Sequence, residues 1–315
     1  MMEKMLISVN TGMTYNFDKP EESMRLLKEC GFEAVDYSLS YILNPGAYVK
    51  GNIYPLAELS LEELKEHLLR VKRAADDNGI VFSQMHAPFP LHIGGHMDKF
   101  EAMFEITCKI LLACGAVGCP YVVFHPYVSG SGDKAREREI NMDMFTRLIP
   151  IAREAGIVIC IENVPRWRDG FTMNGCCTEA KEACKYIDEL NAIAGEELFG
   201  ACFDTGHANC TSSDIKREIL TLGKRIKVLH IHENDTVDDL HMIPYTSKKN
   251  SGGTFDWECF IEGLREIEYE GNLSFECGNG QLVLMPPPCR LDAMKLISSI
   301  GRYFRSRITE EKSEG

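Results

Sequence analysis

The clearest pattern in the chain is a series of short apolar runs, each of which stops at a polar or charged residue. Such runs are typical of strands buried on both faces of a parallel sheet. Six of them end at a residue able to bind a metal or move a proton: 81–86 (VFSQMH), 121–125 (YVVFH), 157–162 (IVICIE), 198–204 (LFGACFD), 226–230 (IKVLH) and 272–276 (NLSFE). Two further runs, 6–10 and 34–38, bring the predicted strands to eight.

Helical patterns separate these strands. Helix starts and stops support them: Ser60 with Glu63 forms a predicted capping box, and Gly31, Gly79 and Gly156 lie just past predicted helix ends. The predicted helices cover 20–30, 60–78, 97–114, 137–155, 178–190, 212–222, 256–267 and 290–304. Eight strands alternating with eight helices predict an α/β fold, a single (β/α)8 TIM barrel. An open doubly wound sheet is the alternative, but it would not readily bring six strand ends to one point.

The pattern also predicts the domain organisation. Nothing resembling a linker divides the chain, so residues 1–315 are expected to form one domain. A polar, glycine-rich stretch at about 233–254 has little periodicity and is longer than most loops of compact domains. As the connection after the seventh strand it would lie over the barrel mouth, either as a lid or as a surface insertion.

Composition limits the partners. The net charge of −13 opposes nucleic-acid binding, which usually begins with a basic surface. No apolar run reaches the ~18 residues of a membrane span, and the first residues lack a secretory signal pattern. The 13 cysteines lack any C-x-x-C pair and lie mostly in apolar stretches, as reduced core thiols do. We therefore expect a cytoplasmic protein with a small-molecule substrate, no membrane and no nucleic acid; a homo-oligomer is left open.

Four of the strand-end residues form a chemically coherent set: Glu162, Asp204, His230 and Glu276. Carboxylate oxygens with one imidazole nitrogen suit one divalent metal, Mn²⁺, Zn²⁺, Co²⁺ or Mg²⁺. Each residue alone has a plainer explanation, because a carboxylate at a strand end often caps the next helix and a histidine there is often structural. Clustered at one barrel mouth, however, the carboxylates would repel one another, and a bound cation would remove that repulsion.

Short phrases along the chain resemble the xylose-isomerase-like TIM barrels. They are HAPF (86–89), FHP (124–126), IENVP (161–165), FDTGHAN (203–209), HIHEND (230–235), DDLHMIP (238–244), GTFDW (253–257) and FEC (275–277), in the order of that superfamily. The superfamily contains sugar and sugar-phosphate isomerases and epimerases, inosose-metabolising enzymes and apurinic endonucleases of the endonuclease IV type. The order of the phrases is more specific for the superfamily than for any member of it.

The resemblance implies a metal-dependent isomerase or epimerase that acts on a sugar, sugar phosphate or polyol ketone by proton transfer through an enediolate. Glu162, Asp204, His230 and Glu276 would then be the metal ligands. Glu162 and Glu276 would also be the catalytic acid and base. The expected substrate-binding residues are His86, His125, His207, His241 and Arg166.

The chain departs from the ketose 3-epimerases of this superfamily at one position. Those enzymes carry a substrate-binding arginine three residues after the glutamate of H-x-x-E. Here Glu233 is followed by Asn234, Asp235 and Thr236. Ketose 3-epimerase activity in particular is therefore not predicted.

Two other interpretations remain. Nine residues resemble, in order, the ligands of a trinuclear zinc site of the endonuclease IV type, which suits attack on a phosphodiester, although the acidic charge opposes it. They are His86, His125, Glu162, Asp204, His207, His230, Asp239, His241 and Glu276. The other interpretation is a metal-binding subunit that acts with a partner in lyase-type sugar chemistry.

Overall fold

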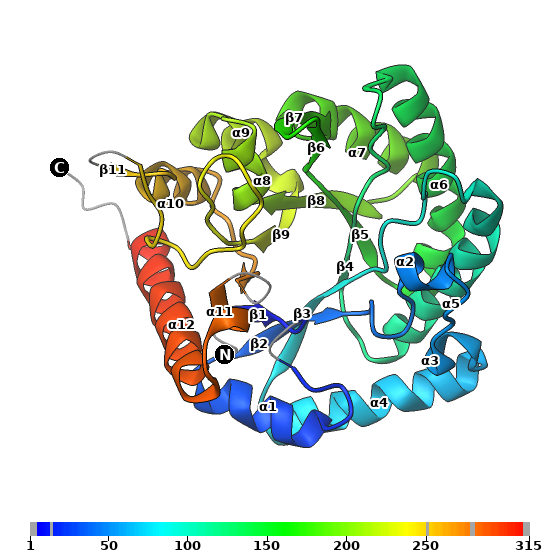
Figure 1. The fold of residues 1–315 in the computed structure, drawn as a ribbon, viewed down its shortest axis with the longest axis horizontal. Coiled ribbons are helices and arrows are strands. Elements are labelled where there is room, and N and C mark those ends of the chain that lie inside the picture. Colours follow the sequence, from blue (N-terminus) through cyan, green and yellow to red (C-terminus); the bar gives the residue numbers. More distant parts are fainter. Residues whose placement is uncertain (1–4, 13–14, 250–251, 278–280, 311–315) are drawn as a thin grey trace.

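Eight parallel strands form a barrel at the centre of the molecule, and helices surround it (Figure 1). The structure is a computed structural model that describes residues 5–12, 15–249, 252–277 and 281–310. The strand order is β12-β1-β2-β3-β4-β5-β8-β9, so each strand pairs with the strand before it in the barrel. The strands are β1 (Ile7–Asn10), β2 (Ala34–Ser38), β3 (Val81–His86), β4 (Tyr121–Phe124), β5 (Val158–Glu162), β8 (Phe199–Asp204), β9 (Ile226–His230) and β12 (Leu273–Phe275).

The barrel closes between β9 and β12 just beyond the last regular residue of β9. Ile231 and Phe275 form a parallel bridge. The Ile231 amide donates to Ser274 O (2.8 Å), and the Glu276 amide donates to Ile231 O (3.0 Å). The structure thus confirms the predicted single (β/α)8 barrel.

The long helices follow the predicted ranges closely. Figure 1 shows α12 lying between α10 and α1, where it completes the outer ring beside the start of the chain. The long helices are α1 (Pro20–Glu29), α4 (Leu61–Asp77), α5 (Phe100–Ala116), α6 (Lys134–Ala155), α7 (Ala180–Ala194), α9 (Ile215–Leu222), α10 (Trp257–Glu266) and α12 (Pro287–Thr309).

The predicted helix boundaries have their expected chemistry. The Ser60 hydroxyl accepts from the Glu63 amide while the Glu63 carboxylate accepts from the Ser60 amide, which is a complete capping box at the start of α4. Gly31 and Gly156 have φ values of 91° and 67°, a left-handed conformation that favours glycine after a helix.

Small apolar side chains fill the barrel below its mouth. Val123, Cys160, Cys202 and Val228, from β4, β5, β8 and β9, form a buried layer there. A larger cluster packs the outer faces of the strands against the helices, with fully buried aromatic residues such as Phe145 and Phe199. Burying a side chain of that size contributes about 1.5–3 kcal/mol. All 13 cysteines are free thiols, mostly buried, as predicted.

Several short elements at the mouth were not predicted. The largest is an antiparallel hairpin, β6 (Val164–Arg168) and β7 (Phe171–Cys176), inserted directly after β5. The others are α2 (Pro45–Tyr48), α3 (Pro55–Glu58), α8 (Thr205–Cys210), α11 (Gln281–Leu284) and the hairpin of β10 (Lys248–Lys249) and β11 (Gly252–Gly253). Across the described ranges, no helix is long and apolar enough to cross a membrane.

Candidate metal centre at the barrel mouth

The four predicted metal ligands meet around one nitrogen atom. His230 is the last residue of β9, and its Nδ1 lies 3.3 Å from Glu162 Oε2, 3.2 Å from Glu276 Oε2 and 3.8 Å from Asp204 Oδ2. The carboxylates belong to the ends of β5 and β8 and to the residue after β12. All four side chains are largely or fully buried.

A fifth carboxylate holds the other side of the His230 ring. His230 Nε2 lies 2.9 Å from Oδ2 of Asp36, a fully buried residue of β2 that also accepts a hydrogen bond from Asn10 Nδ2 (3.0 Å). Burial would lower the pKa of His230, but the neighbouring acidic groups raise it well above its usual value. With a cation bound, a proton kept on Nε2 for Asp36 would leave the Nδ1 lone pair to bind the ion between the three other carboxylates. Carboxylate, histidine and metal are commonly arranged in this order in metalloproteins.

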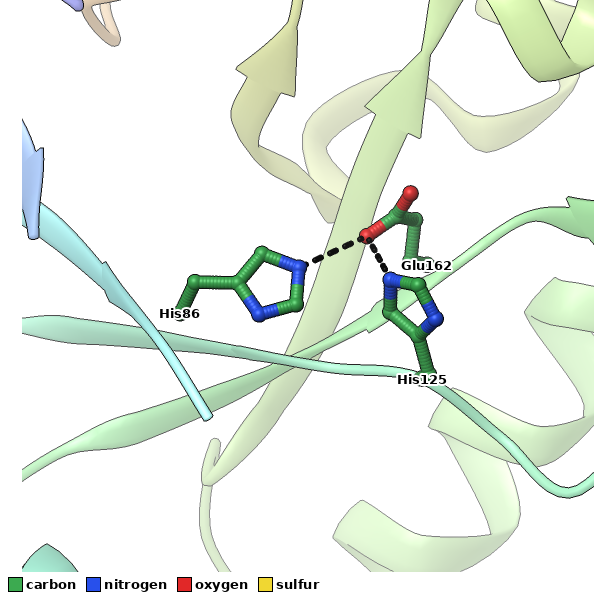
Figure 2. A group of neighbouring side chains, drawn as sticks. All are labelled: His86, His125 and Glu162. Carbon is green, nitrogen blue, oxygen red and sulfur yellow. Dashed lines mark ion pairs between the residues drawn. The ribbon is translucent and has the colours of Figure 1, made fainter. Parts of the chain in front are cut away.

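Glu162 is the most heavily contacted acid of the site. Figure 2 shows His86 and His125 pointing at the same Glu162 oxygen, with Nε2 to Oε2 distances of 3.7 and 3.2 Å. His207 Nδ1 lies 3.0 Å from the other oxygen. Burial alone would raise the pKa of Glu162, but its histidine contacts, with His125 and His230 foremost, hold that pKa well below its usual value. Glu162 is therefore a carboxylate at neutral pH.

The loop after β9 brings two further polar side chains, Asp239 and His241, to the site. Asp239 Oδ2 lies 3.4 Å from His207 Nε2 and 3.1 Å from His241 Nε2. His241 Nδ1 contacts the Glu276 carbonyl oxygen at 2.7 Å. Burial opposes protonation of His241, but Asp239 and Glu276 outweigh it and raise its pKa to about 9. The loop thus reaches the site, although residues 250 and 251 of the predicted stretch lie outside the described residues.

The site fits a cation because several of its buried polar atoms contact only one another. Both Glu162 oxygens and Nδ1 of His207, His230 and His232 have no hydrogen bond within the described part of the chain. Two carboxylates about 4 Å apart repel by roughly 4 kcal/mol at an effective dielectric constant of 20, more than one ordinary hydrogen bond returns. Five overlapping groups of three residues at the mouth, one of which includes the Cys202 thiol, have ligand atoms close enough to share an ion. Oxygen with imidazole nitrogen suits a hard or borderline divalent cation.

Comparison with known proteins identifies the family of the barrel. Residues 24–299 match the model of the xylose isomerase-like TIM barrel family. The chain belongs to this family. The crystal structure of D-psicose 3-epimerase from Clostridium cellulolyticum aligns over 95% of this chain and 99% of its own, with a TM-score of 0.66 and 16% identity, which supports the fold of this xylose isomerase-like barrel.

Curated relatives of this xylose isomerase-like barrel include both an uncharacterized protein and a sugar epimerase. An uncharacterized protein of Methanocaldococcus jannaschii is 30% identical over 195 residues, which cover 58% of this chain and 55% of the relative. L-ribulose 3-epimerase of a Methylomonas species is 25% identical over 186 residues, or 59% of this chain and 58% of the enzyme. The chain thus spans less than two thirds of the length of either relative.

One predicted site residue of this xylose isomerase-like barrel lies away from the ligand cluster. Arg166, on β6, is buried, and its guanidinium donates to Ser129 O (2.7 Å), Asn174 O (3.0 Å) and Glu137 Oε1 (2.5 Å). These contacts tie the β6–β7 hairpin to the start of α6. The hydrogen bonds and the ion pair of Arg166 are thus made to these groups and not to the ligand cluster. His86, His125, His207 and His241 all lie at the cluster.

Two residues of the site, Asp36 and His232, were not among those predicted from the sequence. His232 Nε2 lies 3.0 Å from Asp204 Oδ2, and its ring stacks on that of His241 with centroids 4.2 Å apart. A Cβ atom at Gly206 would come within 1.9 Å of the His232 ring, so only glycine leaves room for it. The sequence does contain a sign of each residue. Asp36 is the one acid inside the apolar run at 34–38, and His232 lies two residues after His230, so both histidines point to the same face of an extended strand.

Proposed function

We propose that this protein is a divalent-metal-dependent isomerase or epimerase that transfers a proton next to the carbonyl of a sugar, sugar phosphate or polyol ketone. One observation carries the proposal: Glu162, Asp204 and Glu276 converge within 3.8 Å of one imidazole nitrogen of His230 in a buried site. The similarity to L-ribulose 3-epimerase supports the sugar chemistry. Because Thr236 stands where ketose 3-epimerases carry arginine, 3-epimerisation of a free ketose is not the reaction we infer.

Glu162, Asp204, His230 and Glu276 would hold the ion, which would be Mn²⁺, Zn²⁺, Co²⁺ or Mg²⁺. Its positive charge would stabilise the negative charge of an enediolate, which forms when the neighbouring C–H proton is removed. Asp36 would keep His230 oriented for this task through the bond to Nε2.

The two glutamates are suited to move the proton. Glu162 ends β5 and Glu276 follows β12, and each has a carboxylate oxygen close to His230 Nδ1, at 3.3 and 3.2 Å. A substrate between them would lose a proton to one carboxylate. Return of a proton by the other glutamate to the opposite face is epimerisation, and return by the same group one carbon along is isomerisation. His86, His125, His207 and His241 are placed to bind substrate hydroxyls.

The test is hydrogen exchange at carbon. Enzyme with Mn²⁺ is incubated in D₂O with a panel of ketoses, their phosphates and inososes, and NMR reports deuterium at carbon. We expect metal-dependent incorporation that falls by about 10²–10⁴-fold in Glu162→Gln and in Glu276→Gln. Glu182→Gln serves as the carboxyl-to-amide control, because Glu182 contacts Lys134 and is not part of the ligand cluster. Exchange that persists unchanged in both site variants would contradict the assignment.

A second candidate is a trinuclear phosphodiesterase of the endonuclease type. The specific observation is that the predicted nine residues do meet: His86 and His125 face Glu162 (Figure 2), and Asp239 links His207 to His241. Metal analysis of protein purified without chelator separates the two, because about one ion per chain favours the isomerase and about three zinc ions favour the phosphodiesterase. Cleavage of abasic DNA without C–H exchange would decide for the second, and activity only with an added protein would indicate a subunit of a larger enzyme.

A further inference from the structure

A cavity of about 300 Å³ lies beside the candidate metal centre, between the loop after β3, the loop after β4 and strand β6. Its lining is mainly apolar and aromatic and includes Pro90, Leu91, Tyr127, Val164 and Trp167. Trp167 is the more informative of these residues because 46% of its surface is exposed although it is a large aromatic side chain. The other tryptophan, Trp257, is buried in the outer core at 3% exposure.

The cavity is continuous with the site through two side chains. His125 lines the cavity, and its Nε2 lies 3.2 Å from Glu162 Oε2. The ring of Trp167 meets the ring of His207 edge to face, with centroids 6.1 Å apart. If the reacting carbons of a substrate lie between Glu162 and Glu276, a second ring attached to that substrate could therefore extend into the cavity.

The charged and titratable residues of the cavity wall do not favour an anionic ligand. Arg166 lies in the wall, but its charge is paired with Glu137, and Ser129 O and Asn174 O accept two further hydrogen bonds from it. Burial lowers the pKa of His92, another wall residue, to about 4, so its ring is neutral at pH 7. Its ring also stacks on Phe100, with centroids 4.0 Å apart. Among the wall residues that the structure describes, no positive charge is therefore left to neutralise a phosphate.

We propose that this cavity binds an uncharged ring, a second sugar or an aryl group, attached to the reacting sugar. The inference rests on the proposed function and narrows its substrate class from free sugars and sugar phosphates to glycosides. The volume is at the low end for small-molecule sites, which fits one ring and not a complete substrate. Aromatic faces such as those of Trp167 and Tyr127 suit the C–H face of a pyranose or the face of an aryl ring.

Calorimetric titration of the Mn²⁺-loaded protein tests the proposal without requiring turnover. The probes are methyl β-D-glucoside, phenyl β-D-glucoside, cellobiose and glucose 6-phosphate. We expect at least one ring-bearing probe to bind about tenfold more tightly than methyl glucoside, and glucose 6-phosphate to gain nothing. Phenyl glucoside binding without cellobiose binding identifies an aryl pocket, and the reverse identifies a sugar subsite.

Variants on the β6–β7 hairpin provide the control. Trp167→Ala should reduce the preference for the ring-bearing probe to less than threefold, whereas Trp167→Phe should retain most of it. Phe171→Ala removes an aromatic residue of the same hairpin that is 71% exposed and outside the cavity wall, so the preference should be unchanged. An equal affinity for methyl glucoside and both ring-bearing probes, or a preference that Trp167→Ala leaves intact, overturns the proposal. Metal-dependent C–H exchange on unsubstituted sugars would then still uphold the proposed function, so the two failures are distinguishable.

Discussion

Replacing Asp36 with Asn is expected to weaken metal binding although Asp36 is not itself among the proposed ligands. The substitution keeps the shape of the side chain and removes its charge. A hydrogen bond to a charged acceptor contributes about 1.5–3 kcal/mol and a neutral one about 0.5–1.5 kcal/mol, so the bond at His230 Nε2 would lose roughly 1–1.5 kcal/mol. That loss corresponds to about a tenfold weaker affinity, the lower end of the 10–100-fold typical of residues that orient a metal ligand.

Competition with a fluorescent chelator measures the affinity for Mn²⁺ or Zn²⁺ in the native protein and in the variant. Glu33→Gln is the matched control, because Glu33 lies just before the first residue of the same strand and pairs with Arg305 instead of with His230. We expect this control to leave the metal affinity unchanged. Equal affinities in the native protein and in Asp36→Asn would refute the orienting role of Asp36, and absence of metal binding by the native protein would refute the centre itself.

Three further predictions concern other parts of the site. Gly206→Ala should displace the His232 ring and lower metal affinity at least tenfold by the same chelator assay, whereas Gly94→Ala, whose added Cβ meets nothing within 4 Å, should not. The pKa of His92 is lowered in the folded state, so its contribution to stability is complete above about pH 6.5 and is lost towards pH 4. Urea unfolding at pH 7 and pH 4.5 should show that the free energy of unfolding falls less in His92→Gln than in the native protein, by about 1–2 kcal/mol. An equal fall in the two proteins would contradict the assignment. Replacing residues 237–252 with a short linker removes Asp239 and His241 from the site and should lower turnover more than 100-fold while shifting Tm by only a few degrees. Unchanged kinetics would leave this loop without a catalytic role.

The barrel and most of its site could be predicted from sequence because both depend on local rules. A buried strand is an apolar run, and its polar end residue marks the carboxyl edge where parallel strands meet. The candidate ligands Glu162, Asp204, His230 and Glu276 were selected in this way, and in the structure each of the three acids has a carboxylate oxygen within 3.8 Å of His230 Nδ1.

The remaining features depend on contacts between distant segments. Asp36 lies inside a strand and not at its end, and its role appears only when β2 and β9 face each other across the barrel. The β6–β7 hairpin follows β5 after one residue, so its sequence looked like the connection to the next helix. Arg166 looked like a free cation, since nothing local indicates that Glu137 and two carbonyl groups would bind it.

The bridge that closes the barrel lies among the residues that surround the candidate ion. Ile231 pairs with Phe275 between His230 and His232 on one side and Glu276 on the other, and two amide hydrogen bonds complete the contact. An ion bound by both His230 and Glu276 would hold these two strands together, so opening the barrel there would require breaking coordination bonds as well as the amide hydrogen bonds. The amide protons of Ile231 and Glu276 should consequently exchange with solvent much more slowly when the ion is present. Their exchange rates would therefore report how much of the protein has the metal bound.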